Sequence, residues 1–501
     1  MKRLGLIVVL PVLVALPVLV ALLSGVSSAM AAPRCAPLLS PRTLPAIRAL
    51  DPKPRAPRVF AVQYRQAAAN VTSYGSFRAT VECLLAKWVL PYRATGRPNV
   101  VVFDEDMGLA TLGVGARGAA ARRLFNRATG ADCVPDCALG SLAVLARSYG
   151  GPLARYRSRF PGVGSYARVF VAATDTIVRA FLATMSDAAR RYGIYVVASG
   201  DLPAFRQSAA RGDVRAFADP ALHARSAYVA TSAAVHNVAF IWGPRNVRRD
   251  GPDVLRNVVA SNLKLPLTPI EQAIQLTPGP AHGAAAVRNL RPFALPGTRA
   301  RLGIATSLPA FVYGASPAGV NPCSDTAVYY MRCLDRLGAN VVIQDEANPG
   351  AWTGPDGNGI EQWQPLSWMG STYRTVSDPA VHFAYNVTAM MVGNLADLVF
   401  DGQSAIAQRG GLRGPGCHYI GNGAFVPGED EASLRGYAGS QRDFLALAPW
   451  VAHDAPRSAL GAVGASLAAG SGSPRVDAYL ETAIVADLPL PVDPHRRGCA
   501  G

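Results

Sequence analysis

Three residues with reactive side chains stand at the ends of apolar runs that are typical of buried strands. They are Glu105, Lys264 and Ser307. A charged group at the end of a core strand costs desolvation unless it is paired or used in chemistry. Each residue also fits a structural role, as an edge salt bridge, a solvated tip or a turn hydroxyl. If the three residues share one site, Glu105 supplies a carboxylate and Lys264 a fixed positive charge. Ser307 then supplies a hydroxyl, which needs an adjacent base to act as a nucleophile.

Lysine is scarce in this sequence, and that scarcity singles out Lys264. The chain has 49 Lys plus Arg residues, of which only four are Lys: Lys2, Lys53, Lys87 and Lys264. Arg presents a planar fork that keeps its proton, whereas Lys supplies a compact charge on a flexible stem. A position that keeps Lys against this preference therefore indicates a need for that geometry.

The composition excludes several protein classes. Of the 501 residues, 50% are hydrophobic and 16% are charged, which is incompatible with a disordered chain. The length also allows a full core, so the chain is not a small disulfide-stapled scaffold. The formal charge of +16 comes from Arg residues spread along the whole sequence. Because nucleic-acid surfaces are usually clustered, we expect no nucleic-acid partner.

Residues 1–32 have the pattern of a signal peptide. Lys2 and Arg3 precede an apolar run over residues 4–23, and Ala29 and Ala31 form the small-x-small pattern of a cleavage site. The sequence therefore predicts a secreted or extracytoplasmic protein. An uncleaved signal anchor is the one membrane contact that stays open, since about 20 apolar residues can span a bilayer.

The even number of cysteines fits an exported protein with disulfides. All eight lie after the predicted cleavage site, and eight cysteines allow 105 pairings. Local spacing suggests Cys133 with Cys137 and Cys323 with Cys333. The remaining residues for longer bridges are Cys35, Cys83, Cys417 and Cys499. No C-x2-C pair occurs, so we expect no zinc or other metal site.

Short apolar runs alternate with helical patterns along most of the chain. We expect strands over residues 58–63, 99–103, 194–198, 227–231, 235–242, 254–263, 302–307, 340–344, 388–392, 404–407 and 479–486, and helices over residues 76–89, 174–192 and 325–337. In the second helix Thr174 is the expected N-cap and Gly193 the stop. The alternation indicates α/β layering with sheets covered by helices.

The predicted organisation is one large domain with additions. A Pro-rich segment over residues 33–57 leads into a domain over residues 58–490, and residues 491–501 form a tail. Residues 106–170 and 409–475 are Gly-rich and are interpreted as insertions.

In order along the chain, several segments resemble the nitrilase superfamily of carbon–nitrogen hydrolases. The matching stretches are residues 59–63, 101–105, 192–197, 262–271, 302–307, 337–342 and 401–406, with a closing strand near Thr482. The resemblance implies a four-layer α-β-β-α sandwich, no cofactor, and a homodimer as one expected assembly.

The resemblance also implies roles for four residues. Glu105 matches the general base, Lys264 matches the lysine that stabilises the tetrahedral oxyanion, and Glu271 matches a second acidic position. Ser307 occupies the position where the family has a Cys nucleophile. Serine is a weak nucleophile without an adjacent base, and a carboxylate serves as that base only when burial raises its pKa.

Three hypotheses follow from that departure. The first is an exported hydrolase of an amide-type small molecule, with Ser307 as its nucleophile. The second is a catalytically inactive secreted protein that binds such a ligand on the same fold. A shifted alignment would instead place the nucleophile at Cys323, although Cys333 offers that residue a disulfide.

Overall fold

The structure is a computed structural model that describes most of the chain. Its described residues are 34–125, 136–315, 319–349, 364–395, 398–410, 412, 444–448 and 480–498. All of them except Arg34 belong to one unit, Cys35–Gly501. The predicted signal peptide and most of residues 409–475 lie outside the described residues, so both interpretations stay predictions.

The strands form one extended mixed sheet whose two halves fold over each other. In chain order they are β1 (Ile47–Ala49), β2 (Arg58–Gln66), β3 (Asn99–Val102), β4 (Tyr195–Ser208), β5 (Ala227–Trp242), β6 (Val258–Leu263), β7 (Phe293–Ala294), β8 (Arg301–Ile304), β9 (Val341–Glu346), β10 (Tyr385–Leu395), β11 (Leu398–Phe400), β12 (Ala405–Gln408), β13 (Phe444–Leu447) and β14 (Thr482–Asp487). The main path runs β6-β5-β4-β3-β2-β10-β9-β8-β7. β2 and β10 join the halves through a short parallel register at Met391–Gly393.

The core between the two half-sheets explains why these strands are apolar on both faces. Val59 and Val100 from one half pack in the same buried cluster as Ile343 and Val387 from the other. The alternate residues of β2, such as Phe60 and Val62, belong to a separate cluster that they share with helices. Strands that are buried on both faces therefore have continuous apolar sequences.

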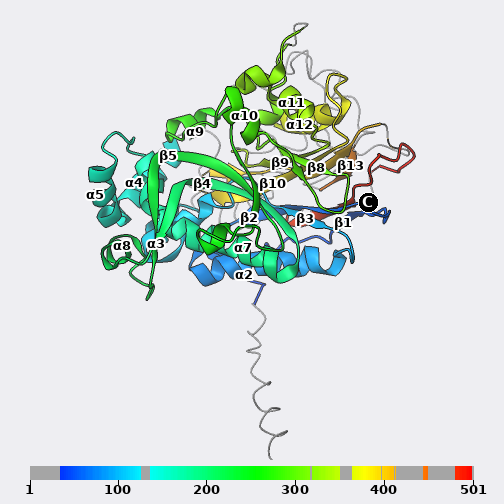
Figure 1. The fold of residues 1–501 in the computed structure, drawn as a ribbon. Coiled ribbons are helices and arrows are strands. Elements are labelled where there is room, and N and C mark those ends of the chain that lie inside the picture. Colours follow the sequence, from blue (N-terminus) through cyan, green and yellow to red (C-terminus); the bar gives the residue numbers. More distant parts are fainter. Residues whose placement is uncertain are drawn as a thin grey trace, which may run out of the picture. The chain divides into compact units, whose positions relative to one another are not determined.

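Helices cover the outer face of each half-sheet. The α-helices of the described residues are α2 (Tyr74–Leu84), α3 (Gly115–Phe125), α4 (Asp136–Ser148), α5 (Gly150–Arg159), α6 (Ala167–Ile177), α7 (Ala183–Tyr192), α8 (Arg211–Phe217), α9 (Pro269–Ala273), α10 (Gly283–Asn289), α11 (Thr326–Arg336) and α12 (Gln364–Ser377). α2, α6 and α7 lie on the half that contains β2 to β6, while α11 and α12 lie on the half that contains β8 to β10 (Figure 1). The predicted four-layer α-β-β-α sandwich is confirmed.

Several predicted elements differ in their limits. The helix expected over residues 174–192 begins at Ala167 and continues through a π-helical turn, Val178–Leu182, into α7. Thr174 is therefore inside the helix and not its N-cap; its hydroxyl donates to the Val171 carbonyl at 2.8 Å. Gly193 ends the helix with φ of 65°, as expected for a left-handed stop.

Three strand predictions also change. The run 254–263 becomes a strand only at Val258, because its first residues belong to a 3-10 turn, η7 (Asp253–Leu255). The runs 227–231 and 235–242 form the single strand β5, because a bulge against β4 absorbs the irregularity between them. The run 302–307 ends as a strand at Ile304, and a short 3-10 helix, η8 (Leu308–Phe311), follows Ser307. Because the strand ends before Ser307, the chain turns at this residue and enters η8.

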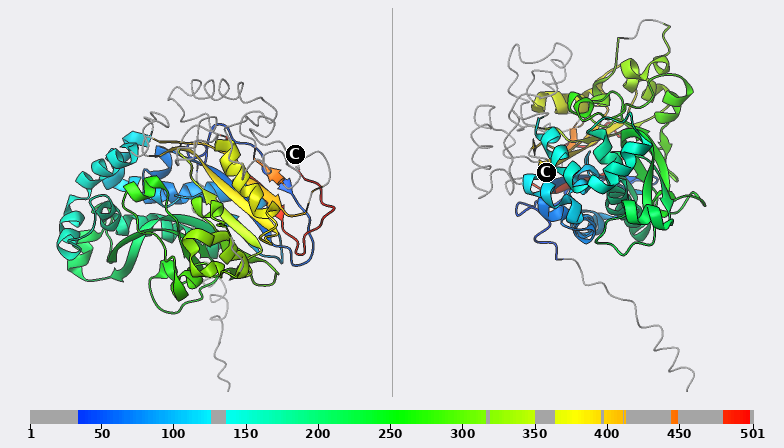
Figure 2. Two further views of the ribbon diagram at one scale, coloured as in Figure 1. Left: turned by 90° about the horizontal axis from the view of Figure 1, so that it is seen from above. Right: turned by 90° about the vertical axis from the view of Figure 1, so that its left-hand side faces the viewer.

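The described residues of the range expected to be the first insertion are mostly helical. α3, α4 and α5 gather at one end of the sandwich, beyond β4 and β5 (Figures 1 and 2). Within the range expected to be the second insertion, β13 pairs with β12 in the second half-sheet.

One helix among the described residues, Ala167–Tyr192, is long and apolar enough to cross a membrane, but 89% of its apolar window is buried inside the unit. It therefore has the character of a core helix.

Candidate active site

The candidate site residues lie at one edge of the sandwich because of strand direction. β2, β3 and β4 run parallel, and β6 is antiparallel to β5, which is antiparallel to β4. The carboxyl ends of β3, β4 and β6 therefore meet at the same edge, where ligands of α/β sheets commonly bind. Glu105 follows β3 and Lys264 follows β6 directly.

The loop that carries Glu105 is held against β4 by two glycines. Phe103 N–H donates to the Val197 carbonyl at 2.9 Å, and Gly108 N–H donates to the Ser199 carbonyl at 2.9 Å. A side chain on Gly108 would place its Cβ 2.9 Å from the Gly200 Cα, and the reverse substitution would be as close. Only glycine at both positions allows these two backbones to approach so closely, so the loop that carries Glu105 packs directly against β4.

Lys264 links two carboxylates inside the core. Its Nζ lies 2.6 Å from Glu105 Oε1 and 2.9 Å from Glu271 Oε2. Glu271 is fixed by a capping box at the start of α9, where the Thr268 N–H and hydroxyl donate to its Oε2 at 2.8 and 2.9 Å. Three of the four residues to which the resemblance gives roles, Glu105, Lys264 and Glu271, are thus joined by direct contacts between side chains.

Asn237 completes the cluster and was missed from the sequence. Its Nδ2 donates to Glu105 Oε1 at 2.8 Å and to Glu271 Oε1 at 3.0 Å. Asn237, Glu105 and Lys264 are each at most 2% exposed. The available signal was an amide side chain inside the apolar run 235–242, where a buried polar group needs partners.

The buried carboxyl groups outnumber the one lysine. Asp201 pairs with Asn237 in the β4–β5 register, which puts both side chains on the same face of the sheet. Burial first, and then the charges of Glu271 and Glu105, raise the pKa of Asp201 well above its usual range. The pKa of Asp106 is raised in the same direction, by burial and then by Asp201 and Glu105. Neither aspartate stood out in the sequence.

The charges in this cluster set the protonation of its members. Burial raises the pKa of Glu105 to about 7; Lys264 opposes that shift, and Glu271 and Asp345 add to it. Burial disfavours the Lys264 ammonium, but Glu105 and Glu271 overcome this and raise its pKa above the ordinary value. The site therefore combines a carboxyl that can exchange a proton near neutral pH with a permanent cation.

Ser307 lies at a strained turn after β8. Its φ of 57° and ψ of −119° are unusual for a residue other than glycine, and it directly precedes η8. Such a strand-to-helix turn is one way in which proteins present a nucleophile. Ser307 N–H donates to the Asp345 carbonyl at 3.0 Å, and the Thr306 hydroxyl donates to Asp345 Oδ1 at 2.8 Å.

The link between Ser307 and the lysine cluster is indirect. Within the described part of the chain, the Ser307 hydroxyl makes no hydrogen bond to Glu105 or Lys264. Asp345 accepts hydrogen bonds from the Ser307 N–H and the Thr306 hydroxyl. It interacts electrostatically with both Glu105 and Lys264. The structure thus joins Glu105, Lys264 and Glu271 directly, and places Ser307 beside a carboxylate that influences them.

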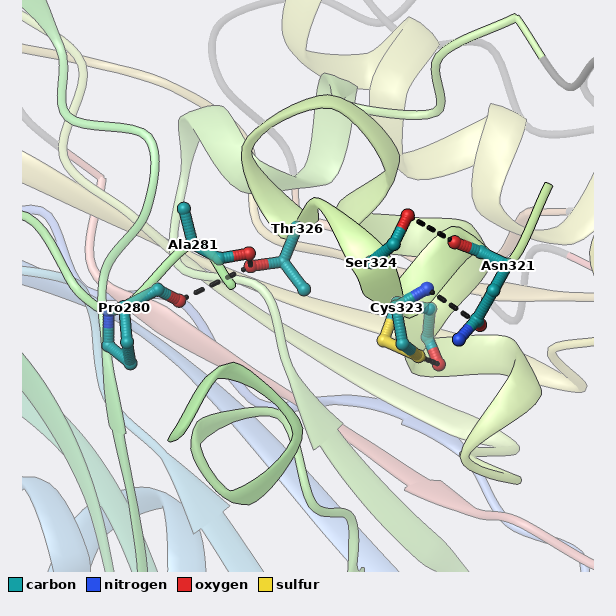
Figure 3. Close-up of a disulfide and its surroundings, with 7 residues drawn as sticks. Pro280, Ala281, Asn321, Cys323, Ser324 and Thr326 are labelled. Carbon is teal, nitrogen blue, oxygen red and sulfur yellow. Dashed lines mark hydrogen bonds between the residues drawn. A yellow bond between two sulfur atoms is a disulfide. The ribbon is translucent and has the colours of Figure 1, made fainter. Parts of the chain in front are cut away.

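Cys323 is engaged in a disulfide and has no free thiol. It pairs with Cys333, as local spacing predicted, and Figure 3 shows this bond beside Asn321, whose Oδ1 accepts from the Cys323 N–H at 3.1 Å. A second disulfide joins Cys35 and Cys83. Cys137 is also disulfide-bonded, whereas Cys133, Cys417 and Cys499 lie outside the described residues. A nucleophilic role for Cys323 is incompatible with this arrangement.

Among the residues that the structure describes, no group of three or more His, Cys, Asp or Glu side chains is arranged to hold a metal ion. The absence of a cofactor, the partners and the oligomeric state stay predictions.

Comparisons with known proteins give distant matches. No family model matches the chain, and no curated protein matches it. A mutant amidase from Nesterenkonia sp. AN1 aligns with 14% identity and a TM-score of 0.33, over 70% of this chain and 85% of that chain. A second mutant of that amidase, described as belonging to the nitrilase superfamily, aligns with 15% identity and a TM-score of 0.33, over 71% and 85%.

A carbon-nitrogen hydrolase from Helicobacter pylori G27 aligns with 12% identity and a TM-score of 0.35, over 70% of this chain and 81% of that chain. Matches at this level assign neither an activity nor a site, so the functional argument rests on the residues of this chain.

Proposed function

We propose that this protein is an exported hydrolase of the nitrilase type that cleaves the carbon–nitrogen bond of an amide-type small molecule. The observation that carries the proposal is the buried Lys264 ammonium, held at 2.6 and 2.9 Å between Glu105 and Glu271. A buried ion group of this kind contributes little net stability compared with apolar packing, so its presence at a sheet edge favours a chemical use.

Glu105 and Lys264 have complementary protonation states for amide hydrolysis. A general base works best when its pKa lies near the working pH, and the pKa of Glu105 is raised to about 7. Lys264 keeps its proton because its neighbours raise its pKa, so it can stabilise a developing oxyanion as a fixed positive charge. Glu271 and Asn237 hold these two groups in position.

The proposed reaction has two steps. In the first, the Ser307 hydroxyl oxygen attacks the amide carbon, Glu105 takes the hydroxyl proton, and the tetrahedral oxyanion lies near Lys264. The C–N bond then breaks, the nitrogen takes the proton from Glu105, and an ester to Ser307 remains. In the second, water attacks the ester, giving its proton through Glu105 to the Ser307 oxygen and releasing the carboxylic acid.

This sequence of steps requires Ser307 to approach Glu105 when substrate binds. Catalytic hydrogen bonds are often long in a free enzyme and tighten only in the complex. The strained backbone of Ser307 fixes the direction of its side chain, and its peptide is anchored to Asp345. These features support a nucleophile that is already oriented, although its base is not yet in contact.

Export is the part of the proposal that concerns location. The signal-like residues 1–32 and the disulfides Cys35–Cys83 and Cys323–Cys333 support an oxidising compartment outside the cytoplasm, where disulfides persist. Detecting the mature N-terminus in the culture medium or the extracytoplasmic fraction of the source cell would test this part. Retention of the full-length chain in the cytoplasm would contradict it.

The proposed activity is tested by a panel of amides and nitriles with the purified protein. We expect release of ammonia or amine from at least one amide, and a mass increase at Ser307 equal to the acyl group when the reaction is quenched early. Ser307→Ala should abolish both signals. Unchanged turnover in Ser307→Ala would contradict the mechanism in which Ser307 is the nucleophile. If an amide binds but neither the parent protein nor the Ser307→Cys variant turns it over, the inactive binding protein is favoured instead.

A further inference from the structure

A buried aspartate on the neighbouring strand holds the turn that carries Ser307. Asp345 lies on β9 and is fully buried. Its carbonyl oxygen accepts from the Ser307 N–H at 3.0 Å, and its Oδ1 accepts from the Thr306 hydroxyl at 2.8 Å. β8 and β9 pair in register only as far as Ile304, so these two bonds continue the attachment beyond the strand. Asp345 therefore fixes both the strained residue and the residue before it.

The second carboxylate oxygen of Asp345 is directed at no partner. Its Oδ2 makes no hydrogen bond in the described structure, which is unfavourable for a buried carboxylate unless the charge is used. Ser199 on β4 opposes the rise in the pKa of Asp345, although the Ser199 hydroxyl makes no hydrogen bond. The Ser199 carbonyl accepts from Gly108, in the loop that carries Glu105. Asp345 thus lies between the Ser307 turn and the Glu105 loop.

The charge of Asp345 reaches the proposed base. Burial is the largest cause of the raised pKa of Glu105; Lys264 opposes it, and Glu271 and then Asp345 add to it. Burial also raises the pKa of Asp345, against the hydroxyls of Ser199 and Thr306 and the charge of Lys264. One carboxylate therefore touches the nucleophile's turn and acts on the base through its charge.

Other ionisable groups surround these two carboxyls. Those that face Asp345, besides Glu105 and Lys264, are Asp104 after β3, Glu346 on β9 and Tyr330 on α11. Those that face Glu105, besides Lys264 and Asp345, are Glu271, Asp104, Asp106, Asp201 and Glu346. Lys264 is the one cation in this described set, so removal of any carboxylate leaves the others more easily ionised.

We propose that Asp345 is a positioning residue for the hydrolysis: it holds the Ser307 turn through its carbonyl and Thr306, and its negative charge keeps Glu105 ready to take the Ser307 proton. The inference rests on the proposed function, because it requires Ser307 to attack and Glu105 to act as the base. Asp345 itself acts through these two residues and does not touch the substrate.

Asp345→Asn separates the charge from the hydrogen bond. The asparagine amide oxygen can still accept from the Thr306 hydroxyl, so the turn should persist and kcat at high pH should fall only a few-fold. Without the negative charge, the midpoint of the kcat/KM profile should move to lower pH by roughly 0.5–1 unit. A purely structural role would not move this midpoint, so an unchanged midpoint would overturn the proposal.

Thr306→Val makes the opposite separation, because it removes the hydrogen bond and keeps the charge at Asp345. We expect kcat to fall roughly tenfold, the scale of a small misplacement of reacting groups, while KM changes little. The midpoint should stay near that of the parent. Thr306→Ser keeps the hydroxyl and should restore kcat. If Thr306→Val has the kcat of the parent, the turn does not need this bond and the positioning role is wrong.

Glu481→Gln is the matched control for the loss of a buried carboxyl. Burial raises the pKa of Glu481 as it does that of Glu105, but Glu481 lies outside the proposed site. Its replacement should change neither kcat nor the midpoint. An equal shift of the midpoint in Glu481→Gln and Asp345→Asn would contradict a specific role for Asp345.

A measurement without substrate distinguishes this inference from the proposed function. Protein labelled with 13C at the glutamate carboxyl carbons reports the titration of Glu105, whose signal is assigned by its loss in Glu105→Gln. If no amide is hydrolysed but Asp345→Asn lowers this midpoint, the proposed function fails and the link from Asp345 to Glu105 stands. If the parent and Asp345→Asn hydrolyse amides with the same midpoint, the inference fails and the hydrolase stands. Should Asp345→Asn not fold, the two Thr306 variants still test the positioning role.

Discussion

Two glutamates of this protein are buried to a similar degree but have different surroundings. Burial raises the pKa of both Glu105 and Glu481 to about 7. Glu481 accepts backbone N–H groups on both oxygens, from Ser40 at 2.5 Å and from Arg65 at 2.9 Å. Glu105 instead shares one oxygen between Lys264 and Asn237.

The difference shows that a raised pKa alone does not identify a reactive group. Glu481 ties the segment before β2 to the sheet, and backbone donors occupy its carboxylate. The partners of Glu105 are side chains, one of which is a cation, and further carboxyl groups lie close to it. The first arrangement fixes the chain, whereas the second provides charges that can act on a ligand.

The largest effect is expected from Lys264→Met, which removes the only cation of the cluster. Glu105 and Glu271 would then be buried without their shared partner, at a cost of about 3–5 kcal/mol of unfolding free energy. Loss of the proposed oxyanion contact should lower kcat by roughly 10²–10³ fold. Chemical denaturation and amide turnover measure the two effects. If Lys264→Met is as stable and as active as the parent, the proposed difference between Glu105 and Glu481 is contradicted.

Glu481→Gln is expected to lower stability without changing the proposed activity. The glutamine NH2 group cannot accept one of the two backbone N–H groups, so about 2–3 kcal/mol of unfolding free energy should be lost. Denaturation curves and kcat/KM of the folded protein would be compared. A fall in kcat/KM as large as that caused by a change at Glu105 would mean that the two glutamates do not differ as proposed.

Removal of the Cys323–Cys333 disulfide tests the region near the Ser307 turn. The double variant Cys323→Ser plus Cys333→Ser frees a loop with a sequence separation of 10, so we expect to lose about 2–3 kcal/mol of unfolding free energy. Activity of the folded variant should persist, because neither sulfur takes part in the proposed steps. Complete loss of activity in a folded variant would restore Cys323 as a candidate.

The pH dependence of activity and of stability should run in opposite directions. Amide hydrolysis needs ionised Glu105, so kcat/KM should fall about tenfold per pH unit below pH 7. The folded pKa values of Glu105 and Glu481 lie above the unfolded value of about 4.3. Their contribution to stability is therefore full below about pH 4.3 and is lost as the pH rises through 7.

Glu481→Gln provides the control for this profile. It should remove part of the pH-dependent stability while leaving the midpoint of the kcat/KM profile near pH 7. Melting temperatures and kcat/KM measured from pH 4 to 8 are sufficient. A kcat/KM profile that stays flat across pH 7 would exclude Glu105 as the base.

Physical patterns in the sequence predicted the layers and singled out Glu105 and Lys264, whereas Glu271 came only from the family resemblance. Continuous apolar runs identify strands buried on both faces, and Lys264 was conspicuous among arginines. Asn237 and Asp201 could not be placed because they meet only through the pairing of β4 with β5. Such a register depends on tertiary contacts that a linear pattern does not contain.

Local signals also misled at particular positions. Thr174 has a residue type that often caps helices, but the chain before it is apolar enough to extend the helix to Ala167. The strand expected through Ser307 ends at Ile304 because the chain turns at a strained backbone angle. Propensity does not reveal strain of this kind, since tertiary contacts impose it.

The most direct test of the central claim compares kcat/KM for an amide substrate in the parent protein and in Glu105→Gln. Glutamine keeps the size of the side chain and an acceptor for Lys264 but cannot take a proton. We predict a loss of about 10²–10⁴ fold in kcat/KM, with a melting temperature close to that of the parent. Equal kcat/KM in the two proteins would show that the buried Glu105–Lys264–Glu271 cluster serves the fold and not the reaction.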